Sequence, residues 1–230
     1  FVLNEASYWM IKEYEFWMNH KSVDIPFKKN IYKLNVYRVN TNSPRPESYA
    51  EDTFWAKSFL TDYEKAQFYS NIATAAESGY DFSSRWLKDA SDLRTIQTTD
   101  LIPVDLNAIL YKTEVIISNL CMKKNDNNCA KLFKKYALKR RIAINKFLWS
   151  EDKMCWGDFN RVTNQVTKDF YISDLAPLWQ GIKPPNRISP SSIIAQYSFM
   201  FEKFQGGIPV SLINSGQQWV GIKDFFIRKI

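Results

Sequence analysis

The chain has 230 residues, a formal net charge of +7, and 45% hydrophobic and 24% charged residues. These are the proportions of an ordinary globular protein, so they exclude an intrinsically disordered chain, and no run of about 18 apolar residues predicts a membrane span. The aromatic content of 16% is high, which favours large rings in a core or in the wall of a binding site. The three cysteines and the one histidine lack the spacing of zinc ligands, so we expect no metal site.

Apolar residues recur at helical spacing along most of the chain, and these patterns predict about six helices. Their predicted ranges are 5–19, 47–59, 63–78, 105–120, 127–149 and 190–204. Gly79 ends the third helix, because glycine readily adopts the left-handed conformation at a helix end, and Asp105 is the expected N-cap of the fourth. A polar loop is predicted after the first helix, and residues 154–179 indicate a short hairpin or an ordered loop. The chain is therefore predicted to be all-α, in one domain with long loops and little strand.

Basic residues gather in the stretch KLFKKYALKRRIAINKF, residues 131–147. Its apolar residues fall at helical spacing and most of its lysines lie elsewhere, which indicates the solvated face of an amphipathic helix. Contact with phosphate groups is the less favoured alternative, because no nucleic-acid-binding motif accompanies the basic residues. We therefore expect no nucleic-acid partner.

Cys121 and Cys129 bracket the polar loop MKKNDNN, and Cys155 lies further along the chain. A disulfide formed in an oxidising compartment and two free thiols are both open for the first pair. The chain begins without Met and without a basic leader, so no signal peptide is predicted, and this start indicates a segment of a longer protein. A secreted and a membrane-anchored parent protein are both open.

The stretch AAESGYDFSSRW places an acid between two aromatic rings. Asp81 follows Gly79 and is flanked by Tyr80 and Phe82, and rings that exclude water disfavour the charged form of a carboxyl group. Such a carboxyl can stay protonated and act as a general acid, although a nearby Arg85 would favour the charged form. An aspartate that caps the turn after Gly79 is the alternative, and the residues alone leave both open.

A second motif, NSPRPESYAED, combines prolines with opposite charges. Pro46 disfavours a helical conformation at Arg45, and in an extended backbone Arg45 and Glu47 project to the same side. An arginine and a carboxylate held in this way can bind neighbouring hydroxyl groups of a sugar. The alternative is a helix start, with Pro46 in the first turn and with Glu47, Glu51 and Asp52 favourable near the positive end of the helix dipole. Both can hold together.

A third motif, GGIPVSLINSGQQW, combines glycines with amides and a tryptophan. Gly206 and Gly207 allow a ligand to approach the backbone closely, while Gln217, Gln218 and Trp219 offer hydrogen bonds and a ring face. These features suit a sugar subsite, and ordinary turn and core packing is equally open. The three motifs together describe a pocket of carboxylates, arginine, amides and rings, which is the composition of a glycosidase site.

A fourth block, PVDLNAILYKTE, covers residues 103–114. In their order and separation along the chain, the four blocks resemble those of the trehalases, and the animal-type members look most similar. The resemblance runs from about residue 5 to Trp219. It implies an (α/α)6 toroid, present here with about half of its helices, that hydrolyses α,α-trehalose to glucose with inversion and without a cofactor. It also implies site residues: Asp81 as catalytic acid, Arg45, Pro46 and Glu47 on substrate hydroxyls, a backbone contact from Gly79, and Trp219 as a pocket wall.

The sequence also departs from the trehalase pattern. Tyr80 stands where the family has Trp, which keeps a ring and predicts altered packing. We expect 1–219 to be a central part of the catalytic domain and 220–230 an unrelated tail. The catalytic base is expected in a glutamate segment beyond Trp219 that has no match here, with Glu47 or Glu77 as minor candidates. The chain alone is therefore expected to be inactive; a different (α/α)6 glycosidase and a catalytically dead disaccharide-binding or regulatory protein are the alternatives.

Overall fold

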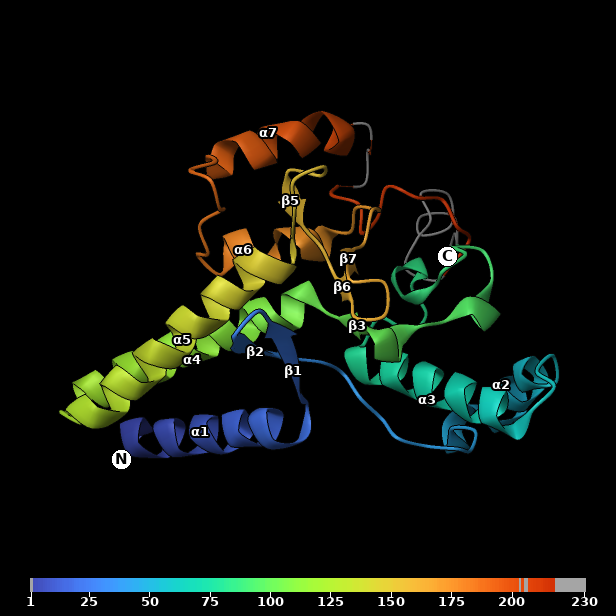
Figure 1. Cartoon of the computed structure of the whole chain (residues 1–230), viewed down its shortest axis with the longest axis horizontal. Helices are drawn as coiled ribbons and strands as arrows, with labels where there is room; N and C mark the ends of the chain where they lie inside the picture. The colour runs from blue at the N-terminus through green and yellow to red at the C-terminus, as the bar shows by residue number, and fades with distance from the viewer. Residues whose placement is uncertain (1, 203, 205–206, 218–230) are drawn as a thin grey trace, which may run out of the picture. The chain divides into compact units, whose positions relative to one another are not determined.

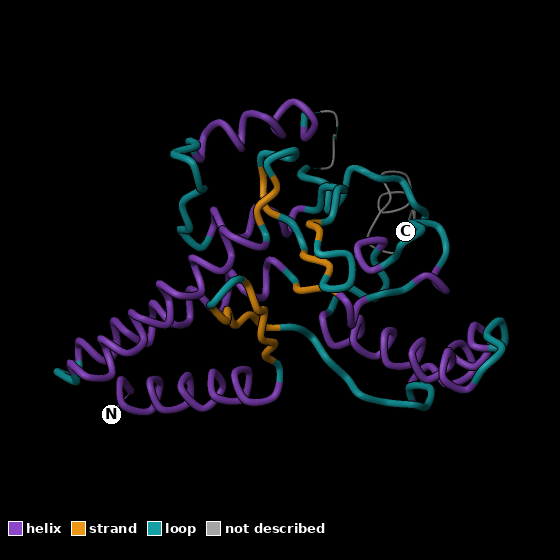
Figure 2. The backbone as a smooth tube through the Cα atoms, viewed as in Figure 1, coloured by secondary structure: helices purple, strands orange, loops and turns teal. Residues whose placement is uncertain are grey.

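The structure is a computed structural model of the chain, and it describes residues 2–202, 204 and 207–217. These residues form two compact units. The first comprises the described residues up to Val36, Ile102–Lys168 and Ser173–Ser198; the second comprises Tyr37–Leu101, Asp169–Ile172 and the described residues from Phe199 onward. Both units consist mostly of helices and loops, as predicted, with a few short strands (Figure 2).

The first unit contains most of the regular elements. Its helices are α1 (Val2–His20), α4 (Val104–Lys123), α5 (Asn127–Phe147) and α6 (Ala176–Trp179), and α7 (Pro190–Phe201) begins in it. Its strands are β1 (Ser22–Phe27), β2 (Asn30–Asn35), β4 (Trp149–Ser150), β5 (Cys155–Trp156), β6 (Phe159–Asn160) and β7 (Gln165–Val166), and β3 (Leu101–Ile102) lies at its boundary. β4 pairs with β5 and β6 with β7, both antiparallel.

The helices α4 and α5 lie side by side and form the centre of this unit (Figure 1). The predicted apolar stripe of α4 is only partly correct, since Leu106, Leu110 and Ile117 are buried whereas Ile109 is 50% exposed and Ile116 is 37% exposed. The predicted stripe is wider than the buried face of α4, which packs against α5 and α1. Ile109 and Ile116 flank this buried face and face outward.

α4 begins one residue before the predicted N-cap. Val104 is its first residue, Pro103 occupies the capping position without a side-chain hydrogen bond, and Asp105 lies in the first turn. At this buried helix start the Val104 backbone N–H has a different partner, Asp158, whose Oδ1 accepts its hydrogen bond at 2.9 Å. A cap supplied from so far along the chain leaves no local signal, so the prediction of Asp105 as the N-cap was wrong.

A β-hairpin replaces part of the loop predicted after the first helix. β1 and β2 pair antiparallel from Ser22 opposite Asn35 to Phe27 opposite Asn30. Lys28 turns the chain with a positive φ of 53°, as two-residue hairpin loops require. The β-branched and aromatic residues of these strands carry the hairpin signal, and the polar residues between them obscured it.

The basic face of α5 is solvated, as predicted. Lys131, Lys134, Lys135 and Lys139 are exposed, while Phe133 is buried on the opposite face. The cysteine alternatives are also decided, because Cys121 and Cys129 form a disulfide.

One arginine of this helix behaves differently from its neighbours. Arg140 is only 3% exposed and pairs with Glu114, which is 1% exposed, through an Nε to Oε1 hydrogen bond of 2.8 Å. The Tyr14 hydroxyl donates to the same Oε1 at 2.8 Å, and Arg140 Nη1 donates to the side-chain oxygens of Asn35 and Asn107. This buried polar network ties α1, β2, α4 and α5 together.

The second unit is smaller and contains the helices α2 (Tyr49–Ala56) and α3 (Asp62–Ser78). Short 3-10 turns cover Pro46–Ser48, Ser84–Trp86, Leu93–Thr95 and Thr98–Asp100. Its core forms under the turn that follows α3, where Trp86, Ile72 and Leu101 are almost fully buried and Tyr80 and Phe82 pack against them.

Candidate active site

Both ends of α3 are fixed by the residues that local chemistry favours. Thr61 and Glu64 form a capping box at its start, and this motif satisfies backbone N–H groups that have no partner inside the helix. Gly79 ends the helix with φ 76°, in the left-handed conformation predicted for it. The chain direction after Gly79, and hence the position of Asp81, follows from this left-handed turn.

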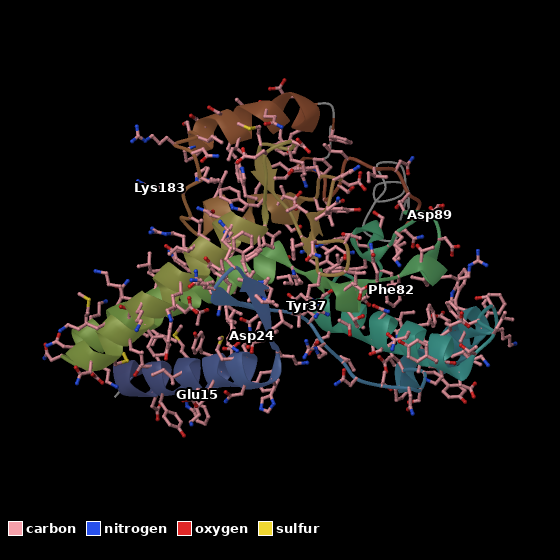
Figure 3. The ribbon with its side chains drawn as sticks, in the orientation of Figure 1. Glu15, Asp24, Tyr37, Phe82, Asp89 and Lys183 are labelled. Atoms are coloured by element: carbon pink, nitrogen blue, oxygen red, sulfur yellow. A yellow bond between two sulfur atoms is a disulfide. The ribbon has the colours of Figure 1, made fainter. Side chains whose placement is uncertain are left out.

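The segment after Gly79 is held by hydrogen bonds on both sides of Asp81. The Ser83 backbone N–H donates to Tyr80 O at 2.9 Å, and the buried indole N–H of Trp86 donates to the same oxygen at 2.9 Å. Asp81 itself is half-buried, and the peptide bond that joins it to Phe82 is cis. Figure 3 shows Phe82 near the end of α3.

Arg45 is held by Asp52, the fourth residue of α2. Three donors of Arg45 converge on this carboxylate: the backbone N–H to Oδ2 at 3.0 Å, Nε to Oδ2 at 2.9 Å and Nη2 to Oδ1 at 2.8 Å. Asp52 is 0% exposed and Arg45 8% exposed. The guanidinium carbon of Arg45 also lies 4.9 Å from the centre of the Phe82 ring, so a cation–π contact joins the Arg45 segment to the Asp81 segment.

The charges around Arg45 are consistent with this arrangement. The pKa of Arg45 is raised above its ordinary value, first by the hydrogen bond to Asp52, against the lowering effect of burial, and then by the negative charges of Asp52, Glu47 and Asp81. Both Glu47 and Asp81 are therefore within electrostatic range of the guanidinium group. The structure brings together Asp81 and the Arg45–Glu47 segment, which are 34 or more positions apart in the chain.

Two backbone conformations predicted for the proline motif occur together. Arg45 has an extended backbone conformation, and Pro46 starts the 3-10 turn that leads into α2. Glu47 is exposed. The extended backbone predicted at Arg45 and the helix start predicted at Pro46 are therefore confirmed.

Glu77 and Arg85, which also stood near Asp81 in the sequence, have structural partners. Glu77 Oε2 accepts a hydrogen bond from the Arg38 backbone N–H at 2.8 Å. Arg85 is 3% exposed, and its guanidinium carbon lies 4.5 Å from the centre of the Trp86 ring and 5.2 Å from that of Tyr80. Tyr80, the residue that departs from the family pattern, thus packs against an arginine.

The model of the trehalase family matches residues 1–220. The chain belongs to the trehalase family. Curated trehalases of Dictyostelium discoideum, Apis mellifera and Homo sapiens are 37%, 35% and 33% identical to it over 92%, 94% and 90% of its length. The chain spans only 37%, 36% and 36% of the lengths of these relatives.

Among solved structures, neutral trehalase Nth1 from Saccharomyces cerevisiae is similar in fold, with a TM-score of 0.56 and 19% sequence identity. The similarity covers 77% of this chain and 36% of the yeast protein. It supports a mostly helical fold of the trehalase type over part of the domain.

The third motif of the sequence, residues 206–219, is described only over 207–217. Gly206, Gln218 and Trp219 lie outside them, and so does the 220–230 tail. Gln217 is described, and its backbone N–H donates to the Ser215 hydroxyl at 3.3 Å. The predicted contribution of Trp219 to the pocket therefore stays a prediction.

Asp52 is the residue that sequence reasoning missed. The sequence predicted it as one of several acids that favour the positive end of a helix dipole, and gave it no partner. Its signal was the position in the first turn of the helix that Pro46 starts, seven residues after Arg45, where the chain can fold back on itself. The burial that makes it a specific partner of Arg45 comes from tertiary packing.

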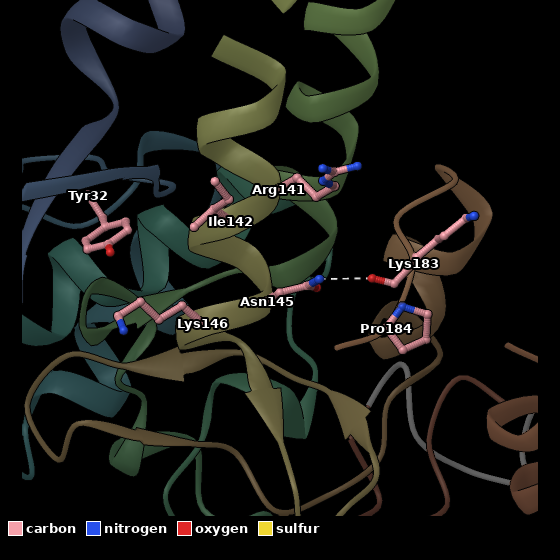
Figure 4. A pocket seen from close by; sticks show the side chains of 7 residues that line it. All are labelled: Tyr32, Arg141, Ile142, Asn145, Lys146, Lys183 and Pro184. Atoms are coloured by element: carbon pink, nitrogen blue, oxygen red, sulfur yellow. Dashed lines mark hydrogen bonds between the residues drawn. The ribbon is translucent and has the colours of Figure 1, made fainter. Parts of the chain in front are cut away.

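One surface cavity of about 590 Å³ is lined by residues of the first unit alone (Figure 4): Tyr32, Arg141, Ile142, Asn145, Lys146, Lys183 and Pro184. Asn145 Nδ2 donates to Lys183 O at 2.9 Å across it. Arg141 and Lys183 extend to one side of α5 and Lys146 to the other (Figure 4), so the three cations do not converge on one point. None of the residues that line this cavity belongs to the second unit, which contains Asp81, so the cavity does not identify the candidate site.

Within the described residues, no three His, Cys, Asp or Glu side chains are grouped where they could hold a metal ion. None of the described helices is long and apolar enough to span a membrane.

Proposed function

We propose that this chain contributes the acid side of a trehalose-hydrolysing site, with Asp81 as the general acid. In this proposal residues 1–219 are part of an (α/α)6 catalytic domain and 220–230 lie outside it. The substrate is α,α-trehalose and the reaction takes water without a cofactor. Trp219 forms a wall of the pocket, an assignment that rests on the family resemblance.

Substrate binding is assigned to the residues around Asp81. Arg45 and Glu47, which flank Pro46, bind hydroxyl groups of the sugar, one by donating and the other by accepting hydrogen bonds. Gly79 contributes its backbone. A residue at this point of the chain must adopt φ 76°, which glycine does without strain.

One observation carries the proposal: the guanidinium carbon of Arg45 lies 4.9 Å from the centre of the ring of Phe82, the residue after Asp81, so the Arg45 segment and the Asp81 segment meet. A cation with two carboxylates in its electrostatic range, one at the exposed Glu47 and one at the half-buried Asp81, is an arrangement that can hold a polar, uncharged sugar. Membership of the trehalase family supports the choice of sugar.

The chemistry is that of an inverting glycosidase. The acid donates its proton to the oxygen between the two sugars as the bond from that oxygen to the anomeric carbon breaks. Water attacks the anomeric carbon from the opposite face and gives up a proton to a second carboxylate, roughly 6.5–9.5 Å from the first in inverting enzymes. The family's base has no match in this chain, so we expect trehalose binding with little release of glucose.

The test uses azide, a nucleophile that needs no base, because it is already deprotonated. With trehalose it would displace glucose from the anomeric carbon with inversion to give β-glucosyl azide, and Asp81 would protonate the departing oxygen. We expect this product from the wild-type chain and a loss of about 10²–10⁴-fold in its rate for Asp81→Asn. Asp89→Asn, an exposed aspartate of the same unit, is the matched control and should not change the rate.

The outcomes separate the candidates. Trehalose binding with no azide product from either chain favours the disaccharide-binding alternative. A wild-type chain that does not bind trehalose refutes the proposal as a whole. Equal rates for the wild type and Asp81→Asn would remove Asp81 from the acid role.

A further inference from the structure

The Asp52 carboxylate is out of reach of a ligand, because it is buried. Its side chain is 1% exposed, and both of its oxygens accept hydrogen bonds from Arg45. It therefore does not touch a substrate. Any effect of Asp52 on the site must act through Arg45.

The contacts of Arg45 fix both the edge and one face of its guanidinium group. Nε and Nη2 bind Asp52 along one edge, and the Phe82 ring covers a face at 4.9 Å. Because the guanidinium group is planar, these contacts determine the direction of all its remaining N–H bonds. Phe82 directly follows Asp81, so the fixed plane is defined relative to the proposed acid.

One end of the group is still available. Within the described residues, Nη1 of Arg45 makes no hydrogen bond. Every buried side-chain nitrogen of Arg45 has a hydrogen-bond partner, so Nη1 is not buried and solvent can reach it. An arginine with a free side chain loses rotamer freedom when it binds a ligand, whereas one held in place has lost that freedom on folding. A pre-oriented Nη1 therefore binds a hydroxyl group more tightly than a mobile one.

We propose that Asp52 is a positioning residue, which holds Arg45 with Nη1 directed at a sugar hydroxyl beside Asp81. The inference rests on the proposed function, because it takes Arg45 as a sugar-binding residue. It adds the residue that determines the orientation of Arg45, and it predicts that the affinity for trehalose depends on a carboxylate that never meets trehalose.

The test measures trehalose affinity by titration calorimetry for the wild type and for Asp52→Asn, which keeps the side-chain shape and removes the charge. Hydrogen bonds to a charged group correspond to about 10–100-fold in an equilibrium constant, so we expect a dissociation constant higher by that factor. Asp92→Asn is the matched control. Asp92 also binds an arginine, Arg94, through Nε and Nη2, in the same unit but on the surface, and its loss should leave the affinity unchanged.

A double variant separates positioning from a general structural role. In an Arg45→Lys background, which lacks the planar fork, Asp52→Asn should cause no further loss of affinity, because its effect passes through Arg45. A purely structural role predicts losses that add. The thermal unfolding temperature is measured for each variant to show that it folds. Because Asp52 and Arg45 are in contact, their losses of stability are not expected to add.

A measurement on the wild type covers the case in which Asp52→Asn does not fold. The Arg45 Nε–H proton should exchange slowly with solvent in NMR spectra, while that of the exposed Arg94 exchanges fast. Fast exchange at Arg45, equal affinities of the wild type and Asp52→Asn, or additive losses in the double variant would each overturn the positioning role alone. A wild-type chain that does not bind trehalose removes the proposed function and this role with it.

Discussion

The disulfide between Cys121 and Cys129 joins the end of α4 to the first turn of α5. The two cysteines are 8 positions apart. In the chain-entropy relation, closing a loop of about eight residues removes about 8.3 cal/mol/K from the unfolded ensemble, or about 2.5 kcal/mol at 25 °C. Reduction should therefore lower the free energy of unfolding by about this amount.

The folded turn itself changes little on reduction, because other bonds hold it. The Asp126 backbone N–H donates to Cys121 O at 2.9 Å, and Asp126 Oδ1 accepts from the Cys129 backbone N–H at 3.0 Å. Both bonds remain possible without the disulfide. The loss is thus expected to arise in the unfolded chain, as the entropy relation assumes.

Urea unfolding followed by circular dichroism, with and without a phosphine reductant, measures the effect. With a urea slope of about 2 kcal/mol per molar, the midpoint should fall by about 1.2 M on reduction. A double variant, Cys121→Ala with Cys129→Ala, is the control and should not respond to the reductant. A midpoint shift below about 0.3 M, or an equal shift in the double variant, would refute the reasoning.

Four further predictions concern buried and strained positions. Arg140→Met should lower the free energy of unfolding by about 3–5 kcal/mol, because it leaves the buried Glu114 without its cation. Arg141→Met, at the exposed neighbouring position, is the control and should have little effect; urea titration measures the free energy of unfolding of both variants. Burial raises the pKa of the Glu114 carboxyl group above its ordinary value of 4.5, so the folded state binds the carboxyl proton more tightly than the unfolded state. The free energy of unfolding should therefore fall as the pH rises from about 4.5 to the raised pKa, and Glu114→Gln should abolish this decline when unfolding is measured against pH. Gly79→Ala should cost about 1–2 kcal/mol in the same assay, since its φ is 76° while a new Cβ would meet no atom within 4 Å. Cys155 is 0% exposed and burial raises its thiol pKa to about 12, so a thiol reagent at pH 8 should modify it in the unfolded chain and leave it unmodified in the folded one.

The sequence predicted the elements whose signals are local. The helix predicted at 63–78 is α3, one residue longer at its start, because the capping box, the apolar spacing and Gly79 all lie within the helix or next to it. Pro46 likewise acts on its immediate neighbours, and both of its predicted effects are present. Such signals need no knowledge of the rest of the fold.

The features that the sequence did not reveal depend on distant partners. Asp158 caps α4 from 54 positions away, and Arg140 is buried by Glu114, 26 positions before it. In the sequence, Arg140 stands among lysines that are exposed, and only its neighbours in space distinguish it. Asp52 at the candidate site differs, because its partner Arg45 is only seven positions away, and what the sequence did not reveal is the burial of this pair.

The motifs that carry the family resemblance have two different physical roles. The motifs around Arg45 and Asp81 place charged groups near each other in the second unit. The motif PVDLNAILYKTE belongs to the first unit, and its polar residues are used for packing: Asn107, 0% exposed, donates to Asn35 O and accepts from the Asn35 backbone N–H, and Glu114 binds Arg140. A substitution of Asn107 should therefore act on stability and not directly on the chemistry, although its motif carries the family resemblance together with the one around Asp81.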